Sequence, residues 1–435
     1  MEPVTVGLLG IVLVFLLLFL GMPIALSCMF VGLAGITYLA SLEAAMPVLA
    51  STVYEVCSFY PYTVIPLFIL MGGFCTSSGM TSNLFTTFDK WLGRLPGGLG
   101  LATIAACAGF AAVSGSSVAS AAAMGTIAIP EMRRFNYDPK LAAGCVAAGG
   151  TLAFLIPPSI GFIVYGMLTE QSIGKLLVSG LLPGLLLAAC YVLTVYLMVK
   201  LDPKLAPASP EPVSFAEKLQ ALKGVSGTLA LFMLVIGGIY LGFFTATEAA
   251  AIGATVMFVW VLASRRLSFA QLLSGLLDSL RISTMVLFLV AGASVFSYFL
   301  ALSTIPTQVA AWAAELTISR YIILLVVVSI YLFLGCLLDS ISMMVLTMPV
   351  IFPVMVALNF HPIWFGVVSV LMMEAGLITP PMGLNVFTVA GVMPDVPLES
   401  IFKGAIPFLG SIILVCLILT IFPQIALVLP MMMGR

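Results

Sequence analysis

Long, uninterrupted stretches of apolar residues dominate the chain and predict helices that cross a membrane. An α-helix rises about 1.5 Å per residue and needs about 20 apolar residues to cross a hydrocarbon core roughly 30 Å thick. Continuous stretches favour helices over a membrane β-barrel, whose strands alternate over about ten residues. By hydropathy, the predicted spans cover residues 4–20, 24–40, 60–79, 140–168 and 176–198 in the first half, and 226–243, 245–264, 283–302, 361–393 and 404–430 in the second.

Each half also contains two apolar segments that are too short to cross a membrane independently. Ser-Gly-Ser-Ser at 114–117 separates the first pair and predicts the tip of a re-entrant hairpin, and residues 335–340 are the corresponding tip in the second half. Irregular backbone at membrane depth is tolerated only inside protein or beside water. The paired segments are residues 98–113 and 117–131, and residues 321–335 and 341–354.

The two halves of the chain share unusual features that recur at a constant offset of 223 residues, the separation of Pro157 and Pro380. Pro157-Pro158-Ser159-Ile160-Gly161 in the first half is matched by Pro380-Pro381-Met382-Gly383-Leu384 in the second, and the same offset places the apolar span 60–79 on 283–302. The longest polar stretch, residues 200–224, carries seven charges and lies between the two apolar blocks. We therefore predict two copies of one fold unit, residues 1–199 and 226–435, joined by a linker at residues 200–225.

The two copies are expected to have opposite orientations in the membrane. Each half has five crossings when its hairpin returns to its own side, and an odd number of crossings inverts the second copy. Glu2 stands where a signal peptide would carry positive charge, so the first apolar segment is interpreted as a membrane helix. With a cytoplasmic linker, thirteen of the sixteen Lys and Arg residues lie on the cytoplasmic side and both termini are periplasmic. The three on the other side are Lys175, Arg320 and Arg435.

Composition excludes several classes of protein. The chain is 62% hydrophobic and 8% charged, against about 25% charged residues in an ordinary soluble domain, so a soluble globular protein is excluded. Its 16 basic and 17 acidic residues provide no basic surface for nucleic acid. The eight Cys residues have no metal-ligand spacing, and no common catalytic motif occurs. We therefore expect no enzymatic activity, no catalytic residue and no cofactor.

Inverted repeats that each carry a hairpin and a broken helix are typical of secondary transporters. At the first tip, small residues and hydroxyls in a turn leave oxygen ligands that suit Na⁺, although close packing of small residues explains the pattern equally well. The facing prolines, Pro157 and Pro158, remove backbone donors and expose carbonyls within the membrane, which favours a site.

The second tip adds acidic residues to this pattern. Asp339 lies at membrane depth, where it is costly unless paired, protonated or bound to a cation, and capping of the returning half-helix is an equally good explanation. Glu374 is a candidate proton or cation site, and snorkelling or a structural hydrogen bond explains it at least as well. Glu248 follows Thr245 at the spacing of a capping box, and His361 before Pro362 is interpreted as a helix-start residue. No Lys or Arg lies in the middle of a predicted span, so half-helix N-termini, hydroxyls and bound cations would hold an anionic substrate.

Several strings resemble the large membrane subunit of tripartite ATP-independent periplasmic (TRAP) transporters, the DctM type. The resemblance covers essentially the whole chain in the right order. Asp339 stands where many relatives carry Glu, and a separate small subunit is expected because the chain starts directly at the first repeat. The strings are 109–117 (GFAAVSGSS), 156–160 (IPPSI), 179–184 (SGLLPG), 247–250 (TEAA), Asp339-Ser340 with Pro349, and 378–385 (ITPPMGLN).

The resemblance implies an all-α, elevator-type carrier of the ion-transporter superfamily, located in the bacterial inner membrane. It implies Na⁺-coupled uptake of a small organic anion, with a carboxylate as the favoured class. It also implies a small four-helix membrane subunit (DctQ type) and a periplasmic binding protein (DctP type) as partners. Carried over by position, one Na⁺ site comprises Ser114, Gly115, Ser116, Ser117, Pro157 and Ser159; the second comprises Gly335, Asp339, Ser340, Thr379, Pro380 and Gly383; and substrate is held by Ser116, Ser117, Ser159 and Asn385.

Two other functions are compatible with the sequence pattern. A stand-alone symporter or antiporter of the same superfamily would keep the fold and need no binding protein. A channel would show conductance with a shallow temperature dependence, but the closed, symmetric pairing of two hairpins argues against it.

Overall fold

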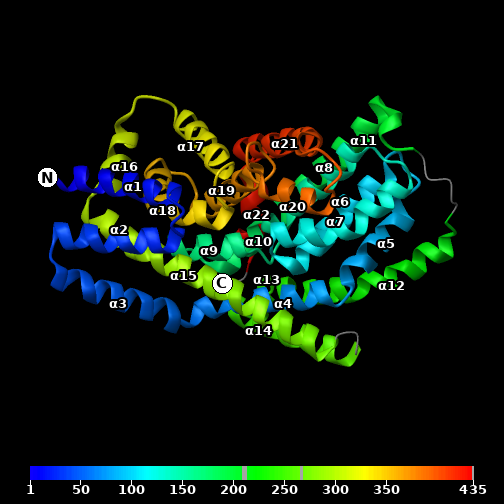
Figure 1. The fold of residues 1–435 in the computed structure, drawn as a ribbon, viewed down its shortest axis with the longest axis horizontal. Coiled ribbons are helices and arrows are strands. Elements are labelled where there is room, and N and C mark those ends of the chain that lie inside the picture. The colour runs from blue at the N-terminus through cyan, green and yellow to red at the C-terminus, as the bar shows by residue number, and fades with distance from the viewer. Residues whose placement is uncertain (208–212, 265–267, 434–435) are drawn as a thin grey trace.

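The chain folds into a bundle of helices around two interrupted helices (Figure 1). The computed structural model describes residues 1–207, 213–264 and 268–433, and these form helices and no strand, which confirms the predicted all-α class. In the first half the helices are α1 (Pro3–Phe19), α2 (Ile24–Leu39), α3 (Leu42–Ser58), η1 (Tyr60–Thr63), α4 (Val64–Ser77), α5 (Met80–Leu92), α6 (Gly98–Ser114), α7 (Ser117–Arg134), α8 (Pro139–Leu155), α9 (Ile160–Thr169), α10 (Ile173–Ser179), α11 (Leu181–Leu201) and η2 (Pro203–Leu205).

The second half follows a similar order of helices. Between α12 and α13 one short segment, η3, is a π-helix. The helices are α12 (Phe215–Phe232), η3 (Met233–Gly237), α13 (Gly238–Tyr240), α14 (Ala246–Ser264), α15 (Phe269–Leu302), α16 (Ile305–Glu315), α17 (Arg320–Gly335), α18 (Ser340–Ala357), α19 (Pro362–Gly376), α20 (Leu384–Val392), α21 (Leu398–Ile421) and α22 (Gln424–Met432).

Hydropathy located the apolar helices well and missed three others. Helices α3, α5 and α16 were not predicted because they are short or interrupted by polar residues, and a hydropathy window detects only sustained apolar sequence. The predicted span 283–302 begins earlier, at Phe269, because the first turns of α15 carry polar residues that still form helix. The predicted span 404–430 is divided at Phe422-Pro423 into α21 and α22.

Helix starts recur at the offset found in the sequence. Helix α7 begins at Ser117 and α18 begins at Ser340, which is the offset that separates Pro157 from Pro380. Helix α8 begins at Pro139 and α19 at Pro362, again at this offset. The Pro157-Pro158 and Pro380-Pro381 peptide bonds, which follow α8 and α19, are both cis. The two halves therefore have matching helical segments at the hairpins and at the broken helices.

The core lies around α8. Every residue of α8 from Leu141 to Leu155 is buried, and the helix packs against α6, α7 and α21. At the crossing with α21, a Cβ on Gly144 would overlap the backbone of Gly404, so the two helices approach backbone to backbone, as small residues allow in membrane proteins. At the other end of the bundle α2 packs against α15, and α4 lies beside α14 and α15 (Figure 1).

Seven helices in the described part of the chain are long and apolar enough to cross a membrane, or eight if α8 and α9 form one span. The α8–α9 pair is bent by 41° at its break. Of the predicted hairpins, α6 and α17 are shorter apolar helices, whereas α18, predicted as a half-length segment at 341–354, extends over Ser340–Ala357 and is one of the seven. The chain is therefore a multi-pass membrane protein in which several apolar helices are too short to cross by themselves.

Contacts between distant segments bring several polar ends together. Arg133 at the end of α7 forms an ion pair with Asp395 in the loop before α21, at 2.8 Å, and this contact holds the pKa of the Asp395 carboxyl below its usual value. The indole Nε1 of Trp91 donates to the carbonyl oxygen of Lys218 at 3.0 Å.

Much of the predicted linker is helical, since α11 extends to Leu201 and α12 starts at Phe215. Residues 208–212 of the linker, and the charges Arg265, Arg266 and Arg435, lie outside the described residues.

Candidate functional site

The first candidate tip is a tight, capped turn between α6 and α7. Gly115 ends α6 in the left-handed conformation, with a φ of 67°. Ser116 is the N-cap of α7, and its Oγ accepts a hydrogen bond from the Ala119 amide at 3.4 Å. Ser114 Oγ accepts from Ser120 Oγ at 3.1 Å. The small residues that suggested ion ligands therefore also build and cap the turn.

The first break is held together by Ser159. Its Oγ donates to the carbonyl oxygen of Phe154 in α8 and accepts from the amide of Phe162 in α9. This one hydroxyl satisfies a free carbonyl of one half-helix and a free amide of the other. Pro157, Pro158 and Ser159 are all buried. Much of the hydrogen-bonding capacity of Ser159 is thus used by the protein backbone.

The first tip and the first break are in contact, as the sequence predicts. A Cβ on Gly115 would lie 2.8 Å from the carbonyl oxygen of Pro158. The Ile160 amide donates to the Gly115 carbonyl at 3.5 Å, a long hydrogen bond. Backbone oxygens and serine hydroxyls from both segments therefore gather in one place. Such oxygens are the ligands that a desolvated hard cation prefers.

The second tip is built differently from the first. Asp339 is the N-cap of α18, and its Oδ2 accepts from the Ser342 amide at 3.1 Å, so the capping interpretation is confirmed. Gly335 at the end of α17 packs on Gly376 at the end of α19, where a Cβ on Gly335 would lie 2.9 Å from the Gly376 Cα. The tip thus meets the last turn of the half-helix, shortly before Thr379.

The second break is more open than the first. Thr379 Oγ1 donates to the carbonyl of Ala375 at 2.7 Å, and Gly383 is left-handed, with a φ of 55°. Pro380 and Pro381 are exposed, whereas Pro157 and Pro158 are buried. The two breaks therefore differ in exposure, although both follow a half-helix at the same offset.

Glu374 connects the two tips. Its side chain is 1% exposed, and it lies on α19, one turn before the second break. Ser117 Oγ, from the first residue of α7, donates to Glu374 Oε2 at 2.5 Å. Ser340 Oγ, from the first residue of α18, donates to Glu374 Oε1 at 3.1 Å. The two carboxylate oxygens thus bind equivalent serines of the two halves.

Asn385 adds a second link between the halves. Its Nδ2 donates to Ser117 Oγ at 3.0 Å and to the carbonyl oxygen of Ala147 at 3.2 Å. Its Oδ1 is buried and has no hydrogen-bond partner among the described residues. An unpaired buried oxygen costs free energy unless a ligand or water binds it, so this atom is a candidate ligand atom.

The predicted substrate residues are mostly buried. Ser117, Ser159 and Asn385 are buried and bonded within the protein, whereas Ser116 is partly exposed beside the exposed Val118. Their role in binding substrate stays a prediction.

Two polar residues outside this cluster have structural roles. Glu248 and Thr245 form a reciprocal capping pair, with the Thr245 amide donating to Glu248 Oε2 at 2.8 Å and the Glu248 amide donating to Thr245 Oγ1 at 3.3 Å. His361 is the N-cap of α19 and accepts from the Ile363 amide through Nδ1 at 3.2 Å. Glu248 lies in the first turn of α14 and His361 directly precedes α19, so both stabilise helix starts, as predicted.

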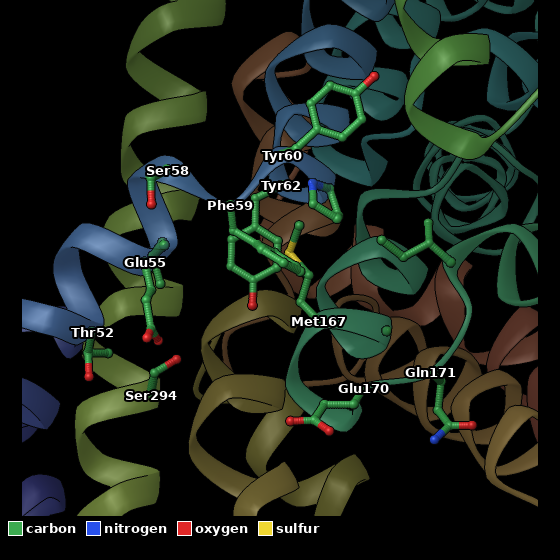
Figure 2. A pocket seen from close by; sticks show the side chains of 14 residues that line it. Thr52, Glu55, Ser58, Phe59, Tyr60, Tyr62, Met167, Glu170, Gln171 and Ser294 are labelled. Atoms are coloured by element: carbon green, nitrogen blue, oxygen red, sulfur yellow. The ribbon is translucent and has the colours of Figure 1, made fainter.

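The structure also contains a cavity, lined by both polar and apolar side chains, that the sequence did not reveal. Its volume is 760 Å³, and Figure 2 shows the side chains that line it. Thr52 and Glu55 come from α3, Ser294 comes from α15, and Glu170 follows α9. The available signal was the acidic residue Glu55 in a segment that hydropathy left unassigned. None of the residues that line this cavity belongs to the Glu374 cluster.

Comparison with known proteins shows which family the sequence of this chain matches. The model of the family described as "Tripartite ATP-independent periplasmic transporter, DctM component" matches residues 11–425. The chain is similar to the C4-dicarboxylate TRAP transporter large permease protein DctM of Pseudomonas aeruginosa, with 38% identity over 93% of this chain and 94% of that protein. It is 30% identical to the sialic acid TRAP transporter large permease protein SiaM of Vibrio cholerae, over 95% of this chain and 96% of that protein.

A solved structure shares the fold at low sequence identity. The Alcanivorax borkumensis YdaH transporter matches with a TM-score of 0.66 and 15% identity, over 90% of this chain and 88% of that one. This similarity concerns the arrangement of the helices alone.

Proposed function

Because this chain belongs to the family of DctM components of tripartite ATP-independent periplasmic transporters, we propose that it is the large permease subunit of a Na⁺-coupled importer of a small organic anion. The observation that carries this proposal is the convergence of both hairpin tips on one buried carboxylate, Glu374. In a membrane protein, such a charge requires a partner, a proton or a cation.

In this proposal each tip and its break hold one Na⁺. The first site uses oxygens of residues 114–117 and of the segment from Pro157 to Ser159, and the contact between Gly115 and Pro158 supports it. The second uses Gly335, Asp339, Ser340, Thr379, Pro380 and Gly383, supported by the packing of Gly335 on Gly376. The N-termini of α7 and α18 carry partial positive charge, which favours a bound anion over a cation, so oxygens of the tips and breaks would have to outweigh it at the Na⁺ sites.

A carboxylate is the proposed substrate class. Relatives are named for C4-dicarboxylate and sialic acid, and each of these compounds carries at least one carboxylate. The three ion pairs among the described residues all lie on the surface. Among the same residues, no Lys or Arg forms an ion pair with Glu374. Helix N-termini, serine hydroxyls and co-bound Na⁺ would therefore hold the anion, near the partly exposed Ser116.

We further propose that the two halves are inverted repeats that move as an elevator. The hairpins and broken helices, α6–α9 and α17–α20, would form the mobile domain and the remaining helices the scaffold. Equivalent helix starts at one constant offset support the repeat. Charge on the mobile domain is costly at membrane depth, so ions and substrate would cross together.

The proposed partners are a small permease subunit and a periplasmic binding protein, which the words "tripartite", "periplasmic" and "large permease" in the names of relatives imply for those proteins. The proposed location is the bacterial inner membrane, with the linker cytoplasmic and both termini periplasmic. The contacts of Arg133 with Asp395 and of Trp91 with Lys218 join loops and helix ends that carry basic residues. They support the placement of these basic residues on one side of the membrane.

Sodium is expected to stabilise the purified protein against unfolding. An ion that binds only the folded state adds RT ln(1 + [L]/Kd), about 1.4 kcal/mol at ten times Kd. We expect a higher unfolding temperature in NaCl than in choline chloride at the same ionic strength, whereas KCl serves as the control for ionic strength and cation size. Equal unfolding temperatures in all three salts would contradict Na⁺ binding by this chain.

Uptake is expected to require a binding protein. The chain, reconstituted with its small subunit in proteoliposomes, should import labelled succinate or sialic acid only with a Na⁺ gradient and a loaded periplasmic binding protein. Liposomes without the binding protein are the control. Uptake by the chain alone would instead support a stand-alone carrier of the same superfamily.

A further inference from the structure

Glu374 holds equivalent residues of the two halves, and this arrangement has no duplicate in the first half. At the offset that relates Pro380 to Pro157, the position equivalent to Glu374 is Thr151. Thr151 Oγ1 is bonded to the carbonyl of Ala148 at 2.6 Å and to the hydroxyl of Tyr191 at 2.8 Å. It therefore reaches neither tip. The single carboxylate of Glu374, on α19, therefore accepts hydrogen bonds from both hairpin tips and connects them.

The hydrogen bonds leave little freedom at either tip. A serine hydroxyl has one proton to donate, and Ser117 and Ser340 both direct it to Glu374. Ser117 Oγ in addition accepts from Asn385. The four side chains are all at least nine-tenths buried, and buried polar networks hold their members in defined positions. A displacement of the first turn of α7 therefore disturbs Glu374 and, through it, the first turn of α18.

We propose that Glu374 is a positioning residue that couples the two hairpin tips. By fixing the first turns of α7 and α18 with its two oxygens, it makes the conformation of one tip depend on that of the other. The inference rests on the proposed function, because ions bound at the tips would then bind cooperatively. Such coupling acts in both directions, so each site changes the affinity of the other by the same factor.

Hydrogen exchange tests the coupling without any ion. In Ser117→Ala, amide exchange is expected to rise about five- to tenfold at the second tip, residues 337–343, although the substitution lies in the first tip. The same substitution in a Glu374→Ala background should cause no further rise at the second tip. Thr151→Val is the matched control, because it removes a buried hydrogen bond at the equivalent position and touches neither tip.

Sodium titration tests the consequence for ion binding. The Hill coefficient of Na⁺-dependent stabilisation is expected to exceed 1 in the unsubstituted protein and to fall to about 1 in Glu374→Ala, while Thr151→Val keeps the original value. Glu374→Gln keeps the side-chain shape and one oxygen acceptor, so we expect an intermediate value. An unchanged Hill coefficient in Glu374→Ala would overturn the inference.

The outcomes separate this inference from the proposed function. If the unsubstituted protein shows no Na⁺ effect, Na⁺ coupling fails, and exchange at the second tip in Ser117→Ala still decides whether Glu374 couples the tips. If Glu374→Ala does not fold, exchange at the second tip in Ser117→Ala still decides, because that variant retains Glu374. Unaltered exchange at residues 337–343 in Ser117→Ala would show that the tips are independent.

Discussion

Alanine at Gly376 is expected to lower the stability of the folded protein by about 1 to 3 kcal/mol and to abolish transport, because it forces two backbones apart. Its Cβ would overlap the backbone of Gly335, and a backbone cannot turn aside as a flexible side chain can. The second tip would move off the end of α19 and carry Ser340 away from Glu374. We expect the Na⁺-dependent rise in unfolding temperature to shrink, with uptake in proteoliposomes as the second measurement.

Gly391→Ala is the matched control for this substitution. Gly391 lies in α20 of the same broken helix, and a Cβ there meets nothing within 4 Å. Alanine favours helix over glycine by about 1 kcal/mol, so this variant should be as stable as the unsubstituted protein or more stable. If Gly376→Ala and Gly391→Ala behave alike, the contact between Gly335 and Gly376 does not hold the second tip.

Alanine at Gly115 is expected to disrupt the first tip. Gly115 has a φ of 67°, and a non-glycine residue in this left-handed conformation costs roughly 1–2 kcal/mol. Its Cβ would also lie 2.8 Å from the carbonyl oxygen of Pro158, so the tip would separate from the first break. Loss of this contact removes oxygens from the proposed first Na⁺ site. We expect lower thermal stability and a weaker apparent affinity for Na⁺.

Gly21→Ala separates the two causes of this loss. Gly21 also has a positive φ, 85°, but a Cβ there meets nothing within 4 Å. The Gly21 variant therefore carries the backbone cost without the clash, and its Na⁺ response should match that of the unsubstituted protein. A Gly115 variant with the same Na⁺ response as the Gly21 variant would remove the Gly115–Pro158 contact from the proposed site.

Local sequence rules worked where the signal is local. Asp339, His361 and the Thr245–Glu248 pair all cap helices as predicted, because capping depends on residues three or fewer positions apart. The hairpins stay a prediction, which was made because the paired apolar stretches in the sequence are too short to cross a membrane; α18 itself is long enough. Helices α3, α5 and α16 escaped this reasoning because hydropathy reports apolar sequence and not helix.

Glu374 shows where sequence reasoning stopped. An acidic residue inside an apolar helix marked it as unusual, and a structural hydrogen bond or an ion site explained it about equally well. Its partners Ser117 and Ser340 lie 257 and 34 residues away in the sequence. Nothing in the residues adjacent to Glu374 specifies which serines it binds. The same holds for Asn385, whose amide reaches Ser117 across 268 residues.

Apolar length by itself determined that this chain is an all-helical membrane protein, and the proline pairs and the constant offset between matching motifs predicted two related halves with hairpins and broken helices. These features follow from the cost of burying an unpaired backbone in lipid, which acts on each segment separately. Only the tertiary structure decided that both tips meet at Glu374, and that the first break is buried while the second is open. Those contacts depend on how α7, α18 and α19 pack, and packing of distant segments is a property of the whole fold.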